Sequence, residues 1–249
     1  MEILLLALFF IAAFASSFVG ALVGGGSLII TSVLLAAGIP PLQVLGSRRV
    51  AAIGGNLGSW IRYHRQKKVD YRLVLILVVP SLIGVLLGFW LIEYFKELDL
   101  RLLMGIFLLA LLCVHVVREV QGDRIRRFHS RTVQHALGVF GAIVASFVNN
   151  IAAAGGGMLL AYTLLLVYGK SILNTAGTSK FLLVIANSFA AVLFIAGDYV
   201  DFELVAVMIV GHFLGGLLGA HFYIKQSKPV LRILLYGVVI LMIIRILFI

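Results

Sequence analysis

Three cationic side chains lie far inside apolar stretches of the sequence, where burying a charge is unfavourable unless another group compensates it. Arg48 and Arg49 belong to the stretch 42–61, and Lys180 belongs to 172–196. A central arginine or lysine costs about 2.5–3.5 kcal/mol on membrane insertion scales. No Asp or Glu lies deep in an apolar stretch to pair with these cations. A bound anion or a water-filled cavity would offset the cost. Alternatively, the arginines snorkel to the interface and Lys180 binds backbone carbonyls.

Two triple-glycine runs form the second candidate feature. Gly24-Gly25-Gly26 precedes the short apolar stretch 27–38, and Gly155-Gly156-Gly157 precedes 158–168. Three consecutive glycines should interrupt a helix, because each costs about 1 kcal/mol relative to alanine. A half-helix beginning near Ser27 or Met158 would point free N–H groups and its positive dipole end into the membrane, and such an end binds anions. The alternative reading of the glycines is close helix packing.

Polar residues near these features would add hydrogen-bond donors. Asn56 and Asn187 either line a pathway or bond neighbouring helices. We interpret the histidines in apolar stretches, His115 and His212, as packed side chains rather than proton carriers. The candidate binding residues from this pattern are Arg48, Arg49, Lys180, Gly25, Gly26, Ser27, Gly156, Gly157, Asn56, Asn187, Asn149 and Asn150.

The composition decides which kind of fold must position these residues. Of the 249 residues, 62% are hydrophobic and only 12% are charged, and the mean hydropathy is +1.15. A water-soluble domain carries roughly a quarter charged residues, so the apolar excess must face lipid. The apolar runs are continuous and do not alternate as barrel strands do. The sequence therefore predicts an all-α polytopic membrane protein, with 3–22 as a retained first helix.

The loops predict the orientation of the helices. Basic residues gather in 62–72, 118–131 and 225–232, whereas 197–203 contains three acidic residues and no Lys or Arg. The positive-inside rule places the three basic loops in the cytoplasm and the acidic loop outside.

The two halves of the chain repeat each other at a constant offset of 131 residues. This offset aligns the glycine runs, Arg49 with Lys180, Asn56 with Asn187, and Asp70 with Asp201. The loop after Asn56 is basic and its counterpart is acidic, so we expect two inverted-topology repeats with glycine-broken half-helices. Inversion requires an odd number of crossings per half, so the short stretches either cross the membrane or re-enter it. The predicted units are a first repeat (1–118), a basic cytoplasmic connector (119–132) and a second repeat (133–249).

Several motifs together resemble a known family. These are Gly20-Ala21-Leu22-Val23-Gly24-Gly25-Gly26, Ala176-Gly177-Thr178-Ser179-Lys180, Asn187 and Gly197-Asp198-Tyr199-Val200-Asp201. In this order they look like the sulfite exporter TauE/SafE family of membrane permeases. The resemblance implies transport of a small anion, often sulfite or a sulfonate, across the bacterial inner membrane. It also adds Thr178 and Ser179 to the candidate binding residues.

The expected function is therefore a secondary transporter, a permease or exporter working by alternating access, and the alternative is an anion channel. An enzyme is not expected, because the apolar stretches contain no carboxylate pair and no HExxH motif. The sequence leaves three possibilities open: transport coupled to protonation of a histidine, transport coupled to sodium, and uncoupled passage. The expected partners are a small anion and the lipid bilayer, with a homodimer left open. No cofactor, metal or nucleic acid is expected.

Overall fold

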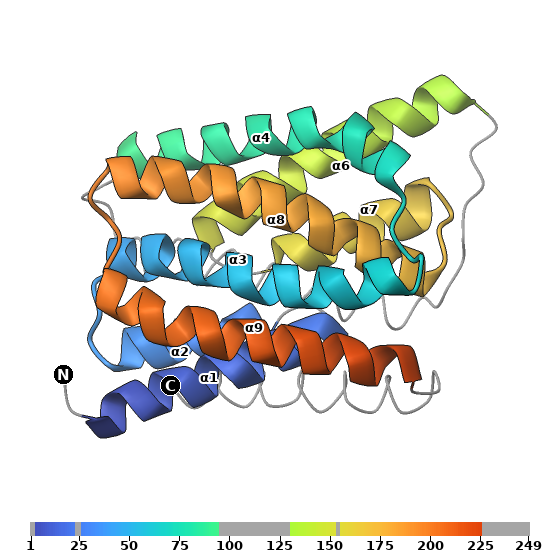
Figure 1. Ribbon diagram of the computed structural model, residues 1–249. Coiled ribbons are helices and arrows are strands. Elements are labelled where there is room, and N and C mark those ends of the chain that lie inside the picture. The colour runs from blue at the N-terminus through green and yellow to red at the C-terminus, as the bar shows by residue number, and fades with distance from the viewer. Residues whose placement is uncertain (1–2, 23–25, 95–129, 153–154, 226–249) are drawn as a thin grey trace, which may run out of the picture.

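The computed structural model describes residues 3–22, 26–94, 130–152 and 155–225, and every regular element within them is a helix (Figure 1). The helices are α1 (Ile3–Leu22), α2 (Ser27–Ala36), α3 (Pro41–Arg65), α4 (Tyr71–Tyr94), α6 (Arg131–Ala152), α7 (Gly156–Val167), α8 (Ile172–Ala196) and α9 (Phe202–Lys225). The all-helical expectation is confirmed. The stretches 102–117 and 230–249 and most of the connector 119–132 lie outside the described residues.

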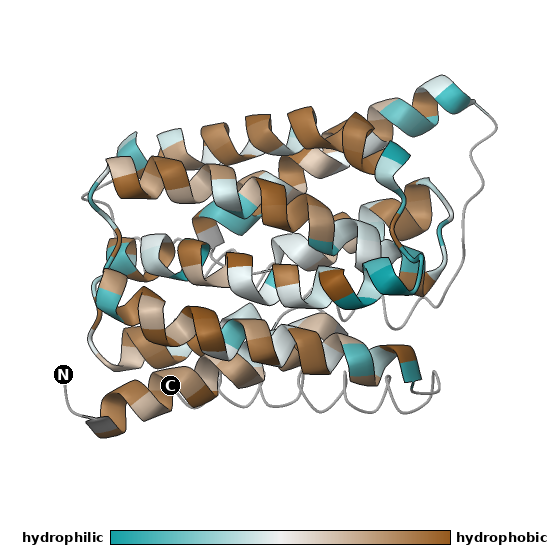
Figure 2. Cartoon of the chain, in the orientation of Figure 1, coloured by the Kyte–Doolittle hydropathy of each residue, from teal (hydrophilic) through white to brown (hydrophobic). Residues whose placement is uncertain are grey.

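Five of these helices, α1, α4, α6, α8 and α9, are long and apolar enough to cross a membrane. The chain is therefore a membrane protein, as its composition predicts. Helix α3 has 25 residues and is as long as α8, but it carries more hydrophilic residues than its neighbours (Figure 2). It packs between α8 and α9, so it lies inside the bundle.

The offset of 131 residues reappears in the helix boundaries. Adding 131 to the first and last residue numbers of α3 gives those of α8, and the same addition turns the bounds of α4 into those of α9. The packing repeats as well. Helix α3 contacts α9, and their counterparts α8 and α4 also contact each other. Likewise α1 contacts α9, and α6 contacts α4. Counterpart helices run in opposite directions along the bundle (Figure 1). The orientation of the two halves relative to the membrane stays a prediction.

Each half opens with a helical hairpin. Gly26, just before α2, lies against Gly20 and the Ser16 carbonyl of α1, and Leu34 near the end of α2 packs with Phe9. Helix α2 therefore returns along α1. In the second half, Gly156 lies against Asn149, and the Gln134 side chain donates 2.8 Å to the Val167 carbonyl. Helix α7 returns along α6 in the same way.

These hairpins contain the short stretches that follow the glycine runs. The expected helix breaks are present, although α2 ends at Ala36 and α7 begins at Gly156, two residues earlier than Met158. A helix of ten residues is only about 15 Å long. Helices α2 and α7 return towards the end from which α1 and α6 start (Figure 1), as they would in either arrangement, so the choice between crossing and re-entry stays a prediction.

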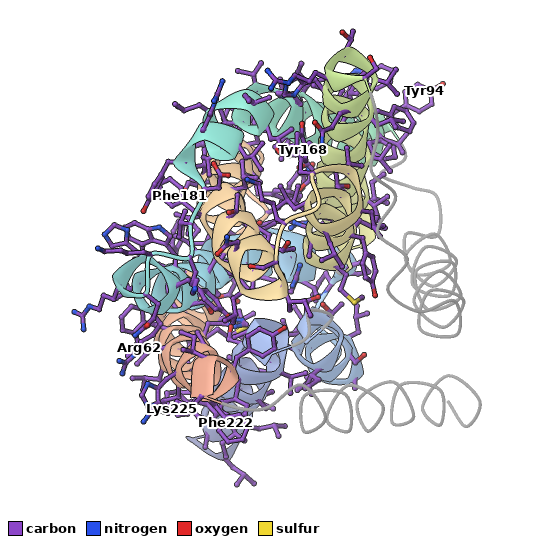
Figure 3. All side chains as sticks on the ribbon, turned by 90° about the vertical axis from the view of Figure 1, so that its right-hand side faces the viewer. Arg62, Tyr94, Tyr168, Phe181, Phe222 and Lys225 are labelled. Atoms are coloured by element: carbon purple, nitrogen blue, oxygen red, sulfur yellow. The ribbon has the colours of Figure 1, made fainter. Side chains whose placement is uncertain are left out.

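Apart from Arg48, Arg49 and Lys180, the charged residues of the described helices lie near the helix ends. Figure 3 looks along the bundle from the end that carries Arg62 of α3 and Lys225 of α9, which lie on the same side of the molecule. Glu203 lies in the first turn of α9, at the opposite end. The basic ends of α3 and α9 thus share one end of the bundle, which agrees with a common cytoplasmic side for their loops.

Candidate functional site

The arginine pair lies in the third turn of α3 and is almost completely buried. Arg48 is 3% exposed and Arg49 is 1% exposed. The reading that these guanidinium groups snorkel to the interface is therefore wrong, because neither reaches the surface of the described structure. No carboxylate among the described residues forms an ion pair with them. Their Nε atoms also have no hydrogen-bond partner among the described residues.

Arg49 joins the two halves through neutral acceptors. Its Nη1 donates 3.2 Å to Oδ1 of Asn187 on α8, and its Nη2 donates to the Asn149 carbonyl on α6. Asn149 belongs to the last turn of α6, where carbonyls lack partners within the helix and the dipole is negative. The guanidinium is thus held by hydrogen bonds, but its charge is not neutralised.

Lys180 makes the equivalent contact in the other direction. Its Nζ donates 3.0 Å to the Gly20 carbonyl, in the last turn of α1. Of the two interpretations of Lys180, binding to a backbone carbonyl is therefore present in the structure. Each half of the chain contributes a cation that binds the helix end preceding the glycine run of the other half.

The described glycines, Gly26 in the first run and Gly155–Gly157 in the second, let each hairpin turn tightly. A side chain at Gly26 would collide with the Ser16 carbonyl, and one at Gly156 with Asn149 and the Ala145 carbonyl. Gly155 adopts a left-handed φ of 77° directly before α7, a conformation that favours glycine. Close packing and helix breaking are therefore both roles of these glycines. Gly25 lies outside the described residues.

The N-termini of the two half-helices have no side-chain cap among the described residues. The Ser27 carbonyl accepts a 2.8 Å hydrogen bond from the Thr31 hydroxyl, and Gly157 contacts a methyl group of Leu183 at 3.2 Å from the position its Cβ would take. The expected helix ends are therefore present, and no side chain of the described chain occupies their first N–H groups.

Four other candidates bond elsewhere in the structure. Asn56 donates 3.0 Å to the Ala52 carbonyl of its own helix, and Ser179 donates 3.0 Å to the Ala176 carbonyl. Asn150 donates 2.8 Å to the Val85 carbonyl of α4. Thr178 accepts a 2.9 Å hydrogen bond from the Asp70 amide. The structure therefore does not bring these four to the arginine pair through any of these bonds.

Ser47 makes a contact that the sequence analysis missed. Its hydroxyl accepts a 2.8 Å hydrogen bond from the Asp201 amide, which is the counterpart of the Thr178–Asp70 bond. The 131-residue offset, which pairs Ser47 with Thr178 and Asp70 with Asp201, was the available signal. Each half thus fastens the loop of the other half beside the start of α3 or α8.

A buried histidine makes a second contact that the sequence analysis missed. His212 of α9 is buried, and its Nδ1 lies 2.5 Å from the Ser17 hydroxyl of α1. The sequence places Ser17 and His212 far apart, so no local pattern indicated their contact.

One ion pair fastens the loops at the basic end of the bundle. Lys170 Nζ lies 2.6 Å from Asp70 Oδ2. Partial burial raises the pKa of the Asp70 carboxyl, but the hydrogen bonds from Lys170 and from the Leu73 amide outweigh it, so the pKa is lowered overall. Within the described ranges, no cluster of three or more His, Cys, Asp and Glu side chains is arranged to hold a metal ion.

Known proteins resemble this chain along nearly its whole length. A Haemophilus influenzae "Probable membrane transporter protein" is 26% identical and covers 92% of this chain and 89% of its own. A Sinorhizobium "Probable membrane transporter protein ORF9" is 27% identical, covering 98% and 92%. The Escherichia coli K12 "Probable membrane transporter protein YfcA" is 24% identical, covering 92% and 84%. No solved structure matches the chain significantly.

The family model described as "Sulfite exporter TauE/SafE" matches residues 8–246. This match spans both glycine runs, the three central cations and the helices that hold them. The chain therefore belongs to the sulfite exporter TauE/SafE family, a family of membrane transporters.

Proposed function

We propose that the chain is a secondary transporter that moves a small anion, a sulfur oxyanion or an organosulfonate, across the bacterial inner membrane by alternating access. The observation that carries the proposal is the buried arginine pair of α3, which has no ion-pair partner among the described carboxylates. The family description, sulfite exporter, supports the sulfur-containing substrate class.

The physical argument rests on charge that the described protein does not neutralise. Hydrogen bonds from Arg49 to Asn187 and Asn149 satisfy two of its N–H groups with neutral acceptors. A buried charge that is bonded but unpaired still carries much of its desolvation cost. An anion placed near Arg48 and Arg49 recovers that cost, and each charge-assisted hydrogen bond contributes about 1.5–3 kcal/mol.

The two hairpins offer the parts that alternating access needs. Helices α1 and α6 end beside cations of the opposite half, through the Lys180–Gly20 and Arg49–Asn149 contacts. A rigid-body movement of one half against the other would change the position of both contacts together. On this proposal, the cations belong to the fixed binding region, and no covalent chemistry is involved.

Flux into proteoliposomes tests the proposal. Purified protein would be assayed with sulfite, methanesulfonate, sulfate, chloride and acetate, alongside Arg48→Gln, Arg49→Gln and a surface control, Arg72→Gln. We expect saturable flux of sulfite or methanesulfonate that the central variants reduce at least tenfold, since one charge-assisted bond is lost in each. Arg72→Gln should transport like wild type, because Arg72 is exposed at the start of α4.

The same assay separates the alternatives. Non-saturating, electrically measurable conductance would identify an anion channel rather than a transporter. Wild-type flux in both central variants would show that the arginine pair has only a structural role, and the proposed site would be wrong.

A further inference from the structure

We infer that His212 is a substrate ligand, a neutral imidazole whose Nε2–H donates to an oxyanion, and that Ser17 sets this tautomer. The inference deepens the proposed function and rests on it. It also specifies the ligand: a group that presents several acceptor oxygens and needs no donor.

The two nitrogens of the His212 ring have different surroundings. Nδ1 lies 2.5 Å from the Ser17 hydroxyl, whereas Nε2 is buried and has no hydrogen-bond partner among the described residues. A hydroxyl can donate to an unprotonated ring nitrogen, and the proton of a neutral imidazole then lies on the other nitrogen. Ser17 thereby leaves Nε2 as a hydrogen-bond donor.

Packing keeps Ser17 in this position. Helix α1 crosses α3 at Gly55, where a Cβ would collide with the Ser17 hydroxyl and approach the His212 carbonyl at 3.2 Å. The absence of a side chain at Gly55 therefore lets Ser17 lie against His212, between three helices. The tautomer is fixed by the close approach of α1, α3 and α9 rather than by the histidine alone.

The neighbours of the ring determine what it would bind. The His212 carbonyl lies against Gly55 of α3, about two turns along that helix from Arg48. The unpartnered Nε atoms of Arg48 and Arg49 are donors, as the inferred Nε2–H is. Buried donors of α3 and α9, two helices that pack together, have no described carboxylate paired to them, so they match an oxyanion and not a cation or a neutral amine.

The residue of the first half that corresponds to His212 is also polar and buried, which supports a polar role for this position inside the bundle. His212 corresponds to Ser81 of α4, which is also buried and whose hydroxyl also has no partner among the described residues. Both halves therefore place a polar side chain at this level of equivalent helices. The histidine, with its longer reach and its fixed donor, distinguishes the second half.

Two substitutions at His212 separate the roles of the ring nitrogens. The side-chain amide of His212→Gln places a donor near the former Nε2 position, whereas His212→Asn reaches only the Nδ1 position. Binding would be measured by the thermal stabilisation of purified protein with sulfite, methanesulfonate and sulfate, using the anion that stabilises wild type most for all variants. His221→Asn, a half-buried histidine further along α9, is the matched control.

We expect His212→Asn to weaken binding by about tenfold to a hundredfold, the value of one charge-assisted hydrogen bond. His212→Gln should stay within about threefold of wild type, a small fraction of one such bond. Ser17→Ala should weaken binding too, because the ring loses the partner that sets its tautomer, and His221→Asn should change nothing.

The contrary results are distinct. If no anion stabilises wild type, the proposed function fails and this inference fails with it. If an anion binds wild type and His212→Asn equally, the proposed function stands and the role of His212 is wrong. If Gln and Asn weaken binding equally while both variants unfold as wild type does, the ring only packs, and the inference is again overturned.

Discussion

Residue 49 of the first half is an arginine, and its counterpart in the second half, residue 180, is a lysine. Both donate to a carbonyl in the last turn of a helix from the opposite half. Only the arginine makes a further bond, to Asn187, because its planar fork reaches two acceptors where an ammonium acts as a point charge. The shared contact belongs to the scaffold, and the additional contact belongs to one half alone.

The loops at the two ends of the bundle also share one contact and differ in a second one. Thr178 and Ser47 fasten equivalent loops through equivalent hydrogen bonds. Asp70 then adds an ion pair with Lys170, whereas the residue equivalent to Lys170 in the first half is Ile39. The scaffold is duplicated, but the charges that fasten its two ends are unequal.

The strongest test of this comparison is whether the halves face opposite sides of the membrane. Arg72 and Glu203 are counterparts and both are exposed in the first turns of α4 and α9. In a Cys113→Ala background, single cysteines at these positions should react with an impermeant maleimide from opposite sides, an all-or-none difference. Reaction of both from the same side of intact cells would eliminate the inverted arrangement.

Much of the fold follows from the sequence, because the signals for it are local or periodic. The apolar stretches predict the helices, and the 131-residue offset pairs α3 with α8. The direction of α2 and α7 could not be predicted, since a short apolar stretch after a glycine run is compatible with continuing the preceding helix or returning along it. Packing of Gly26 on Ser16 decides that question, and it is a tertiary contact.

The site was less predictable for the same reason. Asn56 and Asn187 occupy equivalent positions, yet Asn187 binds Arg49 while Asn56 bonds its own helix. The difference arises from the partner across the interface, an arginine in one case and a lysine in the other. His212 was interpreted as a packed side chain, and its contact with Ser17 spans 195 residues of sequence.

The next largest effect is expected at the two equivalent cations. Arg49→Gln loses two charge-assisted hydrogen bonds, a gross loss of about 3–6 kcal/mol, and Lys180→Gln loses one, about 1.5–3 kcal/mol. Each substitution also removes a buried charge that is costly to desolvate, so the net loss of stability should be smaller in both and larger for Arg49→Gln. Thermal unfolding in detergent measures both. Arg49→Lys makes the first half resemble the second and should fall between wild type and Arg49→Gln.

That substitution is the sharper control, because it keeps the charge and removes the fork. If Arg49→Lys unfolds and transports as wild type does, the bond to Asn187 contributes nothing, and the two halves are functionally equivalent at this position.

A smaller difference is expected between equivalent glycines. A Cβ at Gly26 would collide with the Ser16 carbonyl, which is backbone and cannot move aside, whereas one at Gly157 would meet a flexible Leu183 methyl group at 3.2 Å. Gly26→Ala should therefore cost about 1–3 kcal/mol, as overpacking does, and Gly157→Ala much less. Equal unfolding temperatures for the two variants would mean that the hairpins tolerate the same change, contrary to the structure.

The smallest effect is expected at the ion pair that only one end possesses. Lys170 and Asp70 are 33% and 25% exposed, so solvent screening limits their interaction to about 0.2–1 kcal/mol. The lowered pKa of Asp70 means that this stability is present above the unfolded-state pKa of about 3.9 and is lost as pH falls through the folded-state value. Lys170→Gln should therefore unfold slightly more easily than wild type at pH 7, and the difference should disappear in acid. A difference that persists unchanged at low pH would assign the effect to packing of the lysine stem, and the unequal ends would then have no electrostatic origin.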